Sequence, residues 1–96
     1  MTTEELLKQL KSLKNELRNR FGIEEIALFG SYARKEATPH SDVDLVILKI
    51  EKKEFSKRVQ AIEYLEQKLH KKIDLGYYDS MRSFIKKRIE KDLIYV

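Results

Sequence analysis

The sequence predicts one small α/β domain of the α+β kind, in which a mixed sheet of three to four strands is flanked by about four helices. Three short apolar runs, at residues 23–29, 43–48 and 72–78, have the length and composition of strands. Three other segments carry apolar residues at helical spacing, and a short fourth helix is expected after Ser31. With 96 residues, 42% of them hydrophobic, we expect a single domain over residues 1–96.

The first helix is expected from about Thr3 to Asn19. Thr2, with Glu5 three residues later, has the form of a capping box, and Gly22 is expected to stop the helix. Four leucines recur at helical spacing along it: Leu6, Leu10, Leu13 and Leu17. This stripe is predicted to pack into the core, with a partner interface as the alternative.

The first strand, at residues 23–29, is expected to be buried and to end at a Gly-Ser turn. Ser31 is predicted to cap a short helix at residues 32–37, which Pro39 prevents from continuing. The second strand follows at residues 43–48. This connection is short for a parallel crossover, so strands one and two are expected to be antiparallel.

A long helix is predicted from residue 55 to about residue 70, because five apolar residues share one of its faces. It is long enough for a right-handed crossover, which would set the second strand parallel to a third at residues 72–78. Asp79 and Ser80 are expected to open a final helix, and residues 93–96 could add a short extended end.

Composition excludes several classes of protein. The chain has no cysteine, so disulfides and thiolate metal sites are ruled out, and no apolar run approaches the roughly 18 residues of a membrane span. A cytoplasmic location is therefore expected. The net charge of +4 helps to attract phosphates without marking a dedicated nucleic-acid-binding protein.

Two carboxylates begin the second strand. Side chains alternate along a strand, so Asp42 and Asp44 are expected on one face while Val43 and Leu45 enter the core. Like charges so close repel each other, and a cation would relieve the repulsion. Carboxylate pairs suit Mg²⁺, which also takes oxygens from substrate phosphates. The alternative is an acidic loop end at the start of an edge strand.

A phosphate turn and a third carboxylate complete the pattern. Gly30 permits close approach of the backbone, and Ser31 lies at a helix N-terminus, where free N–H groups attract phosphate, although such turns are also common without a ligand. Asp74 should face the same side as the Asp pair if the third strand lies beside the second. Arg34 either reaches a phosphate or lies in solvent near Glu36. Carboxylates around metal ions beside a phosphate cradle suit nucleotidyl transfer.

These residues also carry a family resemblance. Gly30-Ser31, ten intervening residues and then Asp42-Val43-Asp44 resemble the GSx₁₀DxD signature of the DNA polymerase beta nucleotidyltransferase superfamily. The stretch GSYARKEATPHSDVDLVIL is especially similar to minimal nucleotidyltransferases, single-domain proteins found beside HEPN-domain partners in prokaryotic toxin–antitoxin pairs. Asp74, within IDLGYY, matches the family's third carboxylate, whereas Lys35 stands where a glycine is often found.

The resemblance implies a polymerase-beta-like fold and a set of roles. Gly30 and Ser31 would bind the triphosphate of ATP or another NTP, Asp42 and Asp44 would bind Mg²⁺, and Asp74 would complete the catalytic and metal-binding triad. The implied activity is transfer of AMP from ATP to a tyrosine hydroxyl of a HEPN toxin, for which the chain would be the antitoxin. Two alternatives remain open: a silent module that neutralises its toxin by occlusion, and a small-molecule nucleotidyltransferase of the aminoglycoside-modifying kind. Homo- or hetero-oligomerisation is also left open.

Overall fold

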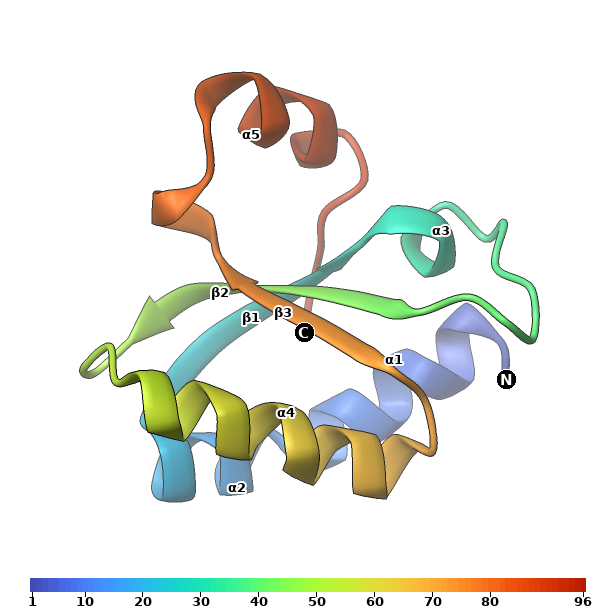
Figure 1. The fold of residues 1–96 in the computed structure, drawn as a ribbon. Helices are drawn as coiled ribbons and strands as arrows, with labels where there is room; N and C mark the ends of the chain where they lie inside the picture. Colours follow the sequence, from blue (N-terminus) through green and yellow to red (C-terminus); the bar gives the residue numbers. More distant parts are fainter.

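In the computed structural model, which describes residues 1–96, helices lie on both faces of a four-stranded sheet (Figure 1). Helices α1, α2 and α4 cover one face, and α5 stands above the other. The elements, in chain order, are α1 (Thr3–Ser12), α2 (Lys14–Phe21), β1 (Ile23–Phe29), α3 (Gly30–Ala33), β2 (Val43–Ile50), α4 (Phe55–Leu69), β3 (Ile73–Tyr77), a 3₁₀ turn (Tyr78–Ser80), α5 (Ser83–Glu90) and β4 (Ile94–Tyr95).

The order of strands in the sheet is β3-β2-β1-β4. Strand β1 runs antiparallel to both β2 and β4, and β2 runs parallel to β3 through the crossover helix α4. These pairings confirm the predicted mixed sheet. None of the helices combines the length and the apolar composition needed to cross a bilayer.

The main core lies between the sheet and helices α1, α2 and α4. Leu6, Leu10 and Leu17 are buried there, which confirms that the leucine stripe packs into the core. Alternate residues of the strands meet them, because successive side chains of a strand point to opposite faces. These strand residues are Ile23, Ile26, Leu28, Val43, Leu45, Ile47, Ile73 and Leu75.

The prediction of one continuous first helix is wrong, because the chain forms two helices there, α1 and α2. The break falls at Leu13, whose φ of −97° and ψ of −2° leave helical geometry. Its N–H donates to the carbonyl of Leu10 at 3.1 Å, a tighter turn than the α-helix makes. Both Leu10 before the break and Leu17 after it are buried, so the break keeps the stripe on the core.

The short helix also differs from its prediction. It begins at Gly30, so Ser31 lies inside the first turn and caps nothing. It ends at Ala33, well before Pro39, because Lys35 takes a left-handed conformation with φ of +61°. Lys35 thus adopts the backbone geometry that a glycine would favour at this position.

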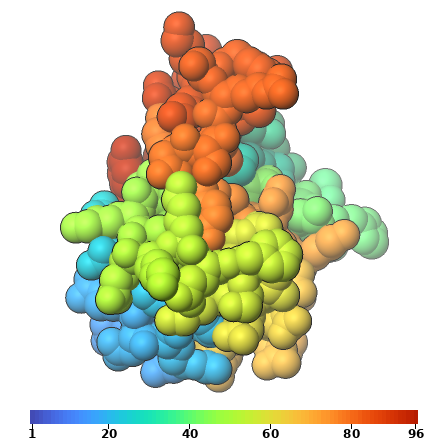
Figure 2. All heavy atoms as spheres, turned by 60° about the vertical axis from the view of Figure 1, so that its left-hand side comes forward, coloured from blue at the N-terminus to red at the C-terminus, as the bar shows by residue number.

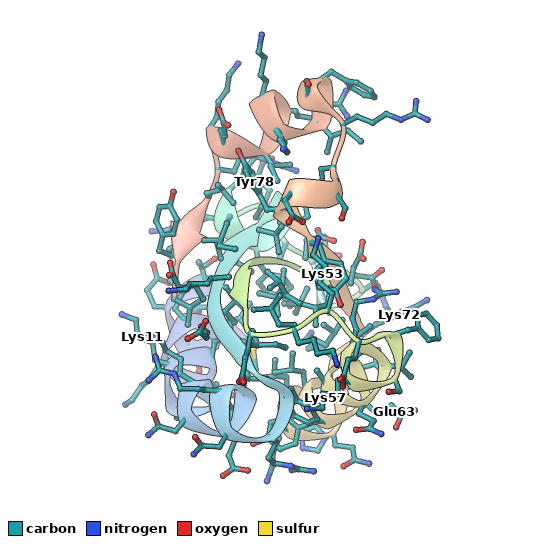
Figure 3. All side chains as sticks on the ribbon, turned by 90° about the vertical axis from the view of Figure 1, so that its left-hand side faces the viewer. Lys11, Lys53, Lys57, Glu63, Lys72 and Tyr78 are labelled. Atoms are coloured by element: carbon teal, nitrogen blue, oxygen red, sulfur yellow. The ribbon has the colours of Figure 1, made fainter.

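The final helix starts later than predicted, at Ser83 rather than at Asp79-Ser80, because a 3₁₀ turn comes first. Space-filling views show this part of the chain rising from the body of the molecule (Figure 2). Tyr78 lies beneath it and donates its hydroxyl to the Glu90 carboxylate at 2.5 Å (Figure 3). Ile89 is buried on its inner side.

The outer edge of β3 is closed by side chains of α4. The N–H of Ile73 donates to a carboxylate oxygen of Glu66 at 3.0 Å. One guanidinium nitrogen of Arg58 donates to the carbonyl of Leu75 at 2.7 Å. Two backbone groups that a free strand edge would leave unpaired therefore have partners.

Candidate active site

Two of the three predicted carboxylates face each other across neighbouring strands. Asp44 of β2 is the direct partner of Asp74 of β3 in the parallel register. Their neighbours Val43, Leu45 and Ile73 are buried in the core, so both carboxylates project to the opposite face of the sheet. Asp42 stands just ahead of β2, in exposed chain rather than in the strand.

Burial and neighbouring charges act on the pKa of Asp44. Its pKa is raised, first by burial and then by the negative charges of Asp74 and Asp42. The positive charge of Arg34 acts in the opposite direction and lowers the pKa. The four side chains therefore share one electrostatic neighbourhood, although they come from three separate parts of the chain.

Gly30 brings the first turn of α3 against the Asp44 carboxylate. Register explains the approach, because Phe29, the residue before Gly30, pairs with Asp44 across β1 and β2. A Cβ atom at Gly30 would lie 3.0 Å from the Cγ atom of Asp44 and would overlap its Oδ2 atom. Gly30 also has a left-handed φ of +77°. Both space and backbone conformation thus require glycine here.

Arg34 ends α3 and forms two ion pairs. Its Nε atom lies 3.3 Å from a carboxylate oxygen of Glu36, the neighbour expected from the sequence. Its Nη1 atom lies 3.1 Å from a carboxylate oxygen of Asp92, just after α5. Hydrogen bonds to Asp92 and then Glu36 raise the pKa of Arg34. Sequence reasoning missed Asp92, because a contact across 58 positions leaves no local signal.

The N-terminus of α1 braces the short helix α3 from below. The buried hydroxyl of Thr3 donates to the carbonyl of Tyr32 at 2.5 Å. Tyr32 is itself buried, and Glu4 pairs with Lys35 at 2.9 Å. Thr3 is the only polar or charged residue, tyrosines aside, that is buried. A helix four residues long depends on such contacts, because its own hydrogen bonds cannot hold it.

The carboxylates suit a cation whose coordination shell is completed by oxygens of the substrate. No three acidic or histidine side chains are placed to enclose a metal ion by themselves. Asp44 and Asp74 face each other, however, and their repulsion adds to the effect of burial in raising the pKa of Asp44; a cation would relieve that repulsion. Mg²⁺ is commonly held by one or two carboxylates together with substrate phosphates, so the donor set suits it.

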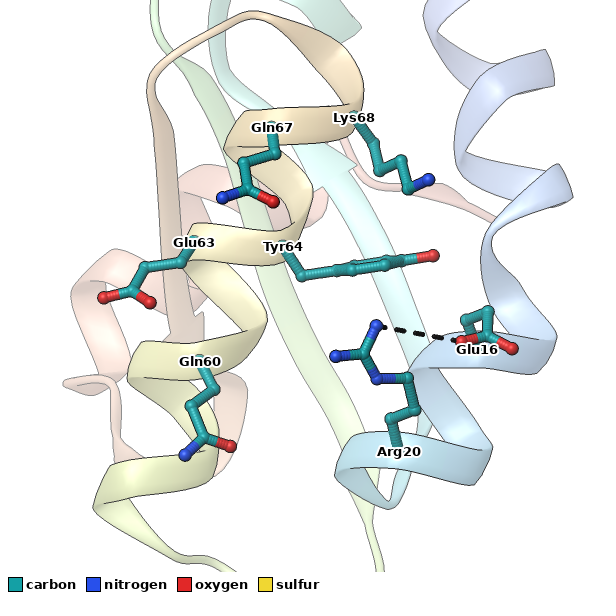
Figure 4. A pocket seen from close by; sticks show the side chains of 7 residues that line it. All are labelled: Glu16, Arg20, Gln60, Glu63, Tyr64, Gln67 and Lys68. Carbon is teal, nitrogen blue, oxygen red and sulfur yellow. Dashed lines mark ion pairs between the residues drawn. The ribbon is translucent and has the colours of Figure 1, made fainter.

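The candidate site is an open face rather than a cleft. None of the five surface hollows is lined by Gly30, Ser31 or the three aspartates. The largest, about 480 Å³, lies between α2 and α4, where it is lined by Glu16, Arg20, Gln60, Glu63, Tyr64, Gln67 and Lys68 (Figure 4). Substrate sites are usually concave.

Comparison with known proteins gives this geometry a context. A family model described as a nucleotidyltransferase domain matches residues 10–96. The protein adenylyltransferase MntA of Thermococcus cleftensis is 41% identical over 96 residues, which cover all of this chain and 97% of that protein.

Solved structures share the fold. The structure of a protein provisionally named a minimal nucleotidyltransferase matches with a TM-score of 0.79 and 24% identity, covering 98% of this chain and 95% of that one. A complex of tri-AMPylated Shewanella oneidensis HEPN toxin with its MNT antitoxin matches with a TM-score of 0.61 and 19% identity, covering 97% and 66%. At these identities the likeness concerns the fold alone.

Proposed function

This chain belongs to the nucleotidyltransferase domain family, and from that premise we propose that it transfers AMP from ATP to a tyrosine hydroxyl of a HEPN-domain toxin and so acts as its antitoxin. The proposal takes Mg²⁺ as the cofactor. It treats residues 1–96 as one catalytic domain. A protein acceptor is favoured over a small molecule because the Thermococcus relative, similar over the whole chain, is named a protein adenylyltransferase.

One observation carries the proposal: Asp44 lies at the meeting point of the phosphate turn and the facing carboxylate. Gly30 approaches Asp44 from α3, and Asp74 opposes it from β3. A triphosphate held at Gly30 and Ser31 would therefore lie beside the carboxylates. Asp42, Asp44 and Asp74 would hold Mg²⁺, which when bound would neutralise triphosphate charge and orient its oxygens.

The reaction is a displacement at the α-phosphorus of ATP. The tyrosine oxygen of the partner forms the new P–O bond, the bond to pyrophosphate breaks, and pyrophosphate leaves. We assign Asp74 the role of accepting the tyrosine proton; its greater exposure, relative to Asp44, supports this assignment. Arg34, held by Asp92 and Glu36, would add positive charge near the departing phosphates.

Labelled ATP tests the activity directly. The purified chain is incubated with α-labelled ATP, Mg²⁺ and the HEPN-domain protein encoded by the neighbouring gene, and label on the partner is measured. We expect label on a tyrosine, and loss of about 100-fold or more in rate for Asp42→Asn, Asp44→Asn or Asp74→Asn. Transfer that survives these substitutions would contradict the assigned roles.

A binding measurement separates catalysis from occlusion. The Asp→Asn variants should still form the complex with the HEPN protein, since they change charge without removing volume. If they also protect cells from the toxin as well as the original chain does, the chain acts by occlusion and the enzymatic proposal fails. Metal binding is read independently of activity: Mg²⁺ with a non-hydrolysable ATP analogue should raise the Tm of the original chain but not of Asp44→Asn.

A further inference from the structure

Helix α5 and the residue after it carry three exposed cations that form no ion pair. One of its faces presents Phe84, Lys87, Arg88 and Lys91, at the i, i+3, i+4 and i+7 positions of a helix, and we call these four residues the α5 crest. All four are exposed, Phe84 with 60% of its surface accessible. None of the three cations takes part in an ion pair.

Two acidic residues lie next to the crest in the sequence. Asp92 pairs with Arg34, and Glu90 accepts the hydroxyl of Tyr78 but keeps its negative charge. Three crest cations against one such carboxylate leave the crest with a net positive charge, whereas Arg34 and Lys35 near α3 both have acidic partners. An exposed aromatic ring among unpaired cations is typical of a surface that meets an acidic partner.

The crest also adjoins the candidate site. Lys91 ends α5, and the next residue, Asp92, holds the Arg34 side chain whose charge acts on Asp44. Because the carboxylates lie on an open face, they provide little area for gripping a protein acceptor. Binding energy for the acceptor has to come from beside the site, and the crest is linked to the site through Asp92 and Arg34.

Resting on the proposed function, we infer that the α5 crest recruits the acceptor: an acidic, tyrosine-bearing segment of the partner protein docks on Phe84, Lys87, Arg88 and Lys91. Acidic residues of that segment pair with the three cations, and an apolar residue covers Phe84. A protein segment is favoured over RNA because the acceptor in the proposed function is itself a protein, as the name of the Thermococcus relative indicates for that protein.

Charge reversal tests the crest. The variant K87E/R88E changes the net charge from +4 to 0, and so does K8E/K11E, which reverses two exposed, unpaired lysines of α1 on the other side of the sheet. Affinity for the purified HEPN protein is measured at about 50 and about 300 mM NaCl, because surface ion pairs are screened by salt. We expect K87E/R88E to raise the Kd by about 10- to 100-fold at low salt and K8E/K11E by less than about threefold.

Phe84→Ala provides a readout that does not depend on charge. It should raise the KM for the HEPN protein by about tenfold, with kcat and the affinity for ATP unchanged. Its Tm should stay within about 2 °C of the original, because the ring is mostly exposed.

The outcomes separate this inference from the proposed function. The crest is not the acceptor surface if K87E/R88E and K8E/K11E weaken binding of the HEPN protein equally. The same conclusion follows if K87E/R88E abolishes binding of a 15-nucleotide single-stranded RNA but leaves the HEPN protein bound. Labelled AMP would still reach the partner in either case, so the proposed function would stand. Binding that depends on the crest without any transfer of AMP would overturn the function and keep the docking surface.

Discussion

Replacing Gly30 with alanine should damage both stability and catalysis, because the new methyl group would meet the Asp44 carboxylate. The Cβ atom would lie 3.0 Å from Cγ and 3.1 Å from Cβ of Asp44, with Oδ2 closer still. The left-handed φ of +77° adds about 1–2 kcal/mol, and displacing the carboxylate adds about 1–2 kcal/mol more. We expect unfolding in urea to show a loss of about 2–4 kcal/mol and AMP transfer to fall at least as far as in Asp44→Asn.

Gly22→Ala is the matched control. Gly22 has a similar φ of +69°, but its added Cβ would meet only the exposed side chain of Glu51, at 3.3 Å, far from the carboxylates. It should cost only the backbone contribution of about 1–2 kcal/mol and leave transfer intact. Combining Gly30→Ala with Asp44→Ala should recover part of the stability and none of the activity. The reasoning fails if both glycine variants lose equal stability and equal activity.

Three further predictions concern stability. Burial and neighbouring carboxylates raise the folded-state pKa of Asp44 above 3.8, so ionised Asp44 opposes folding. Without Mg²⁺, Asp44→Asn should therefore have a higher Tm than the original chain at pH 7. The difference in Tm should shrink as the pH falls through the raised pKa, and it should vanish below about pH 3.8. A lower Tm of Asp44→Asn at pH 7 would contradict this prediction. Thr3→Val removes the buried hydrogen bond to the Tyr32 carbonyl and should lower the free energy of unfolding by about 1–3 kcal/mol, against a small effect of Thr38→Val in the exposed loop. His70→Gly relieves a left-handed φ of +54° at the end of α4 and should raise the free energy of unfolding by about 0.5–1 kcal/mol in urea; no gain would mean that the His70 side chain makes an unrecognised contact.

The sheet was predictable from the sequence because its determinants are local. Strand lengths, the short link from β1 to β2 and the long helix before β3 are all visible in the chain, and they fix the pairing directions. The position of Asp74 opposite Asp44 follows from the same reasoning, since alternation along each strand assigns the face.

Features set by distant contacts were beyond the sequence. The break at Leu13 has no proline or glycine to mark it. Asp92 reaches Arg34 only because α5 folds back over the sheet, and Thr3 reaches Tyr32 only because α1 begins beneath α3. The left-handed backbone of Lys35 was also beyond the sequence, because lysine seldom adopts it and nothing beside Lys35 marks it.

The closed edge of β3 restricts how this protein can assemble. Glu66 and Arg58 occupy two of the outward backbone groups of β3, which hinders pairing with a strand from another chain, and β4 at the opposite edge has only two residues. Complexes should therefore form through side chains and leave the sheet at four strands. At high concentration, the same closure should protect the chain from stacking edge to edge into fibres.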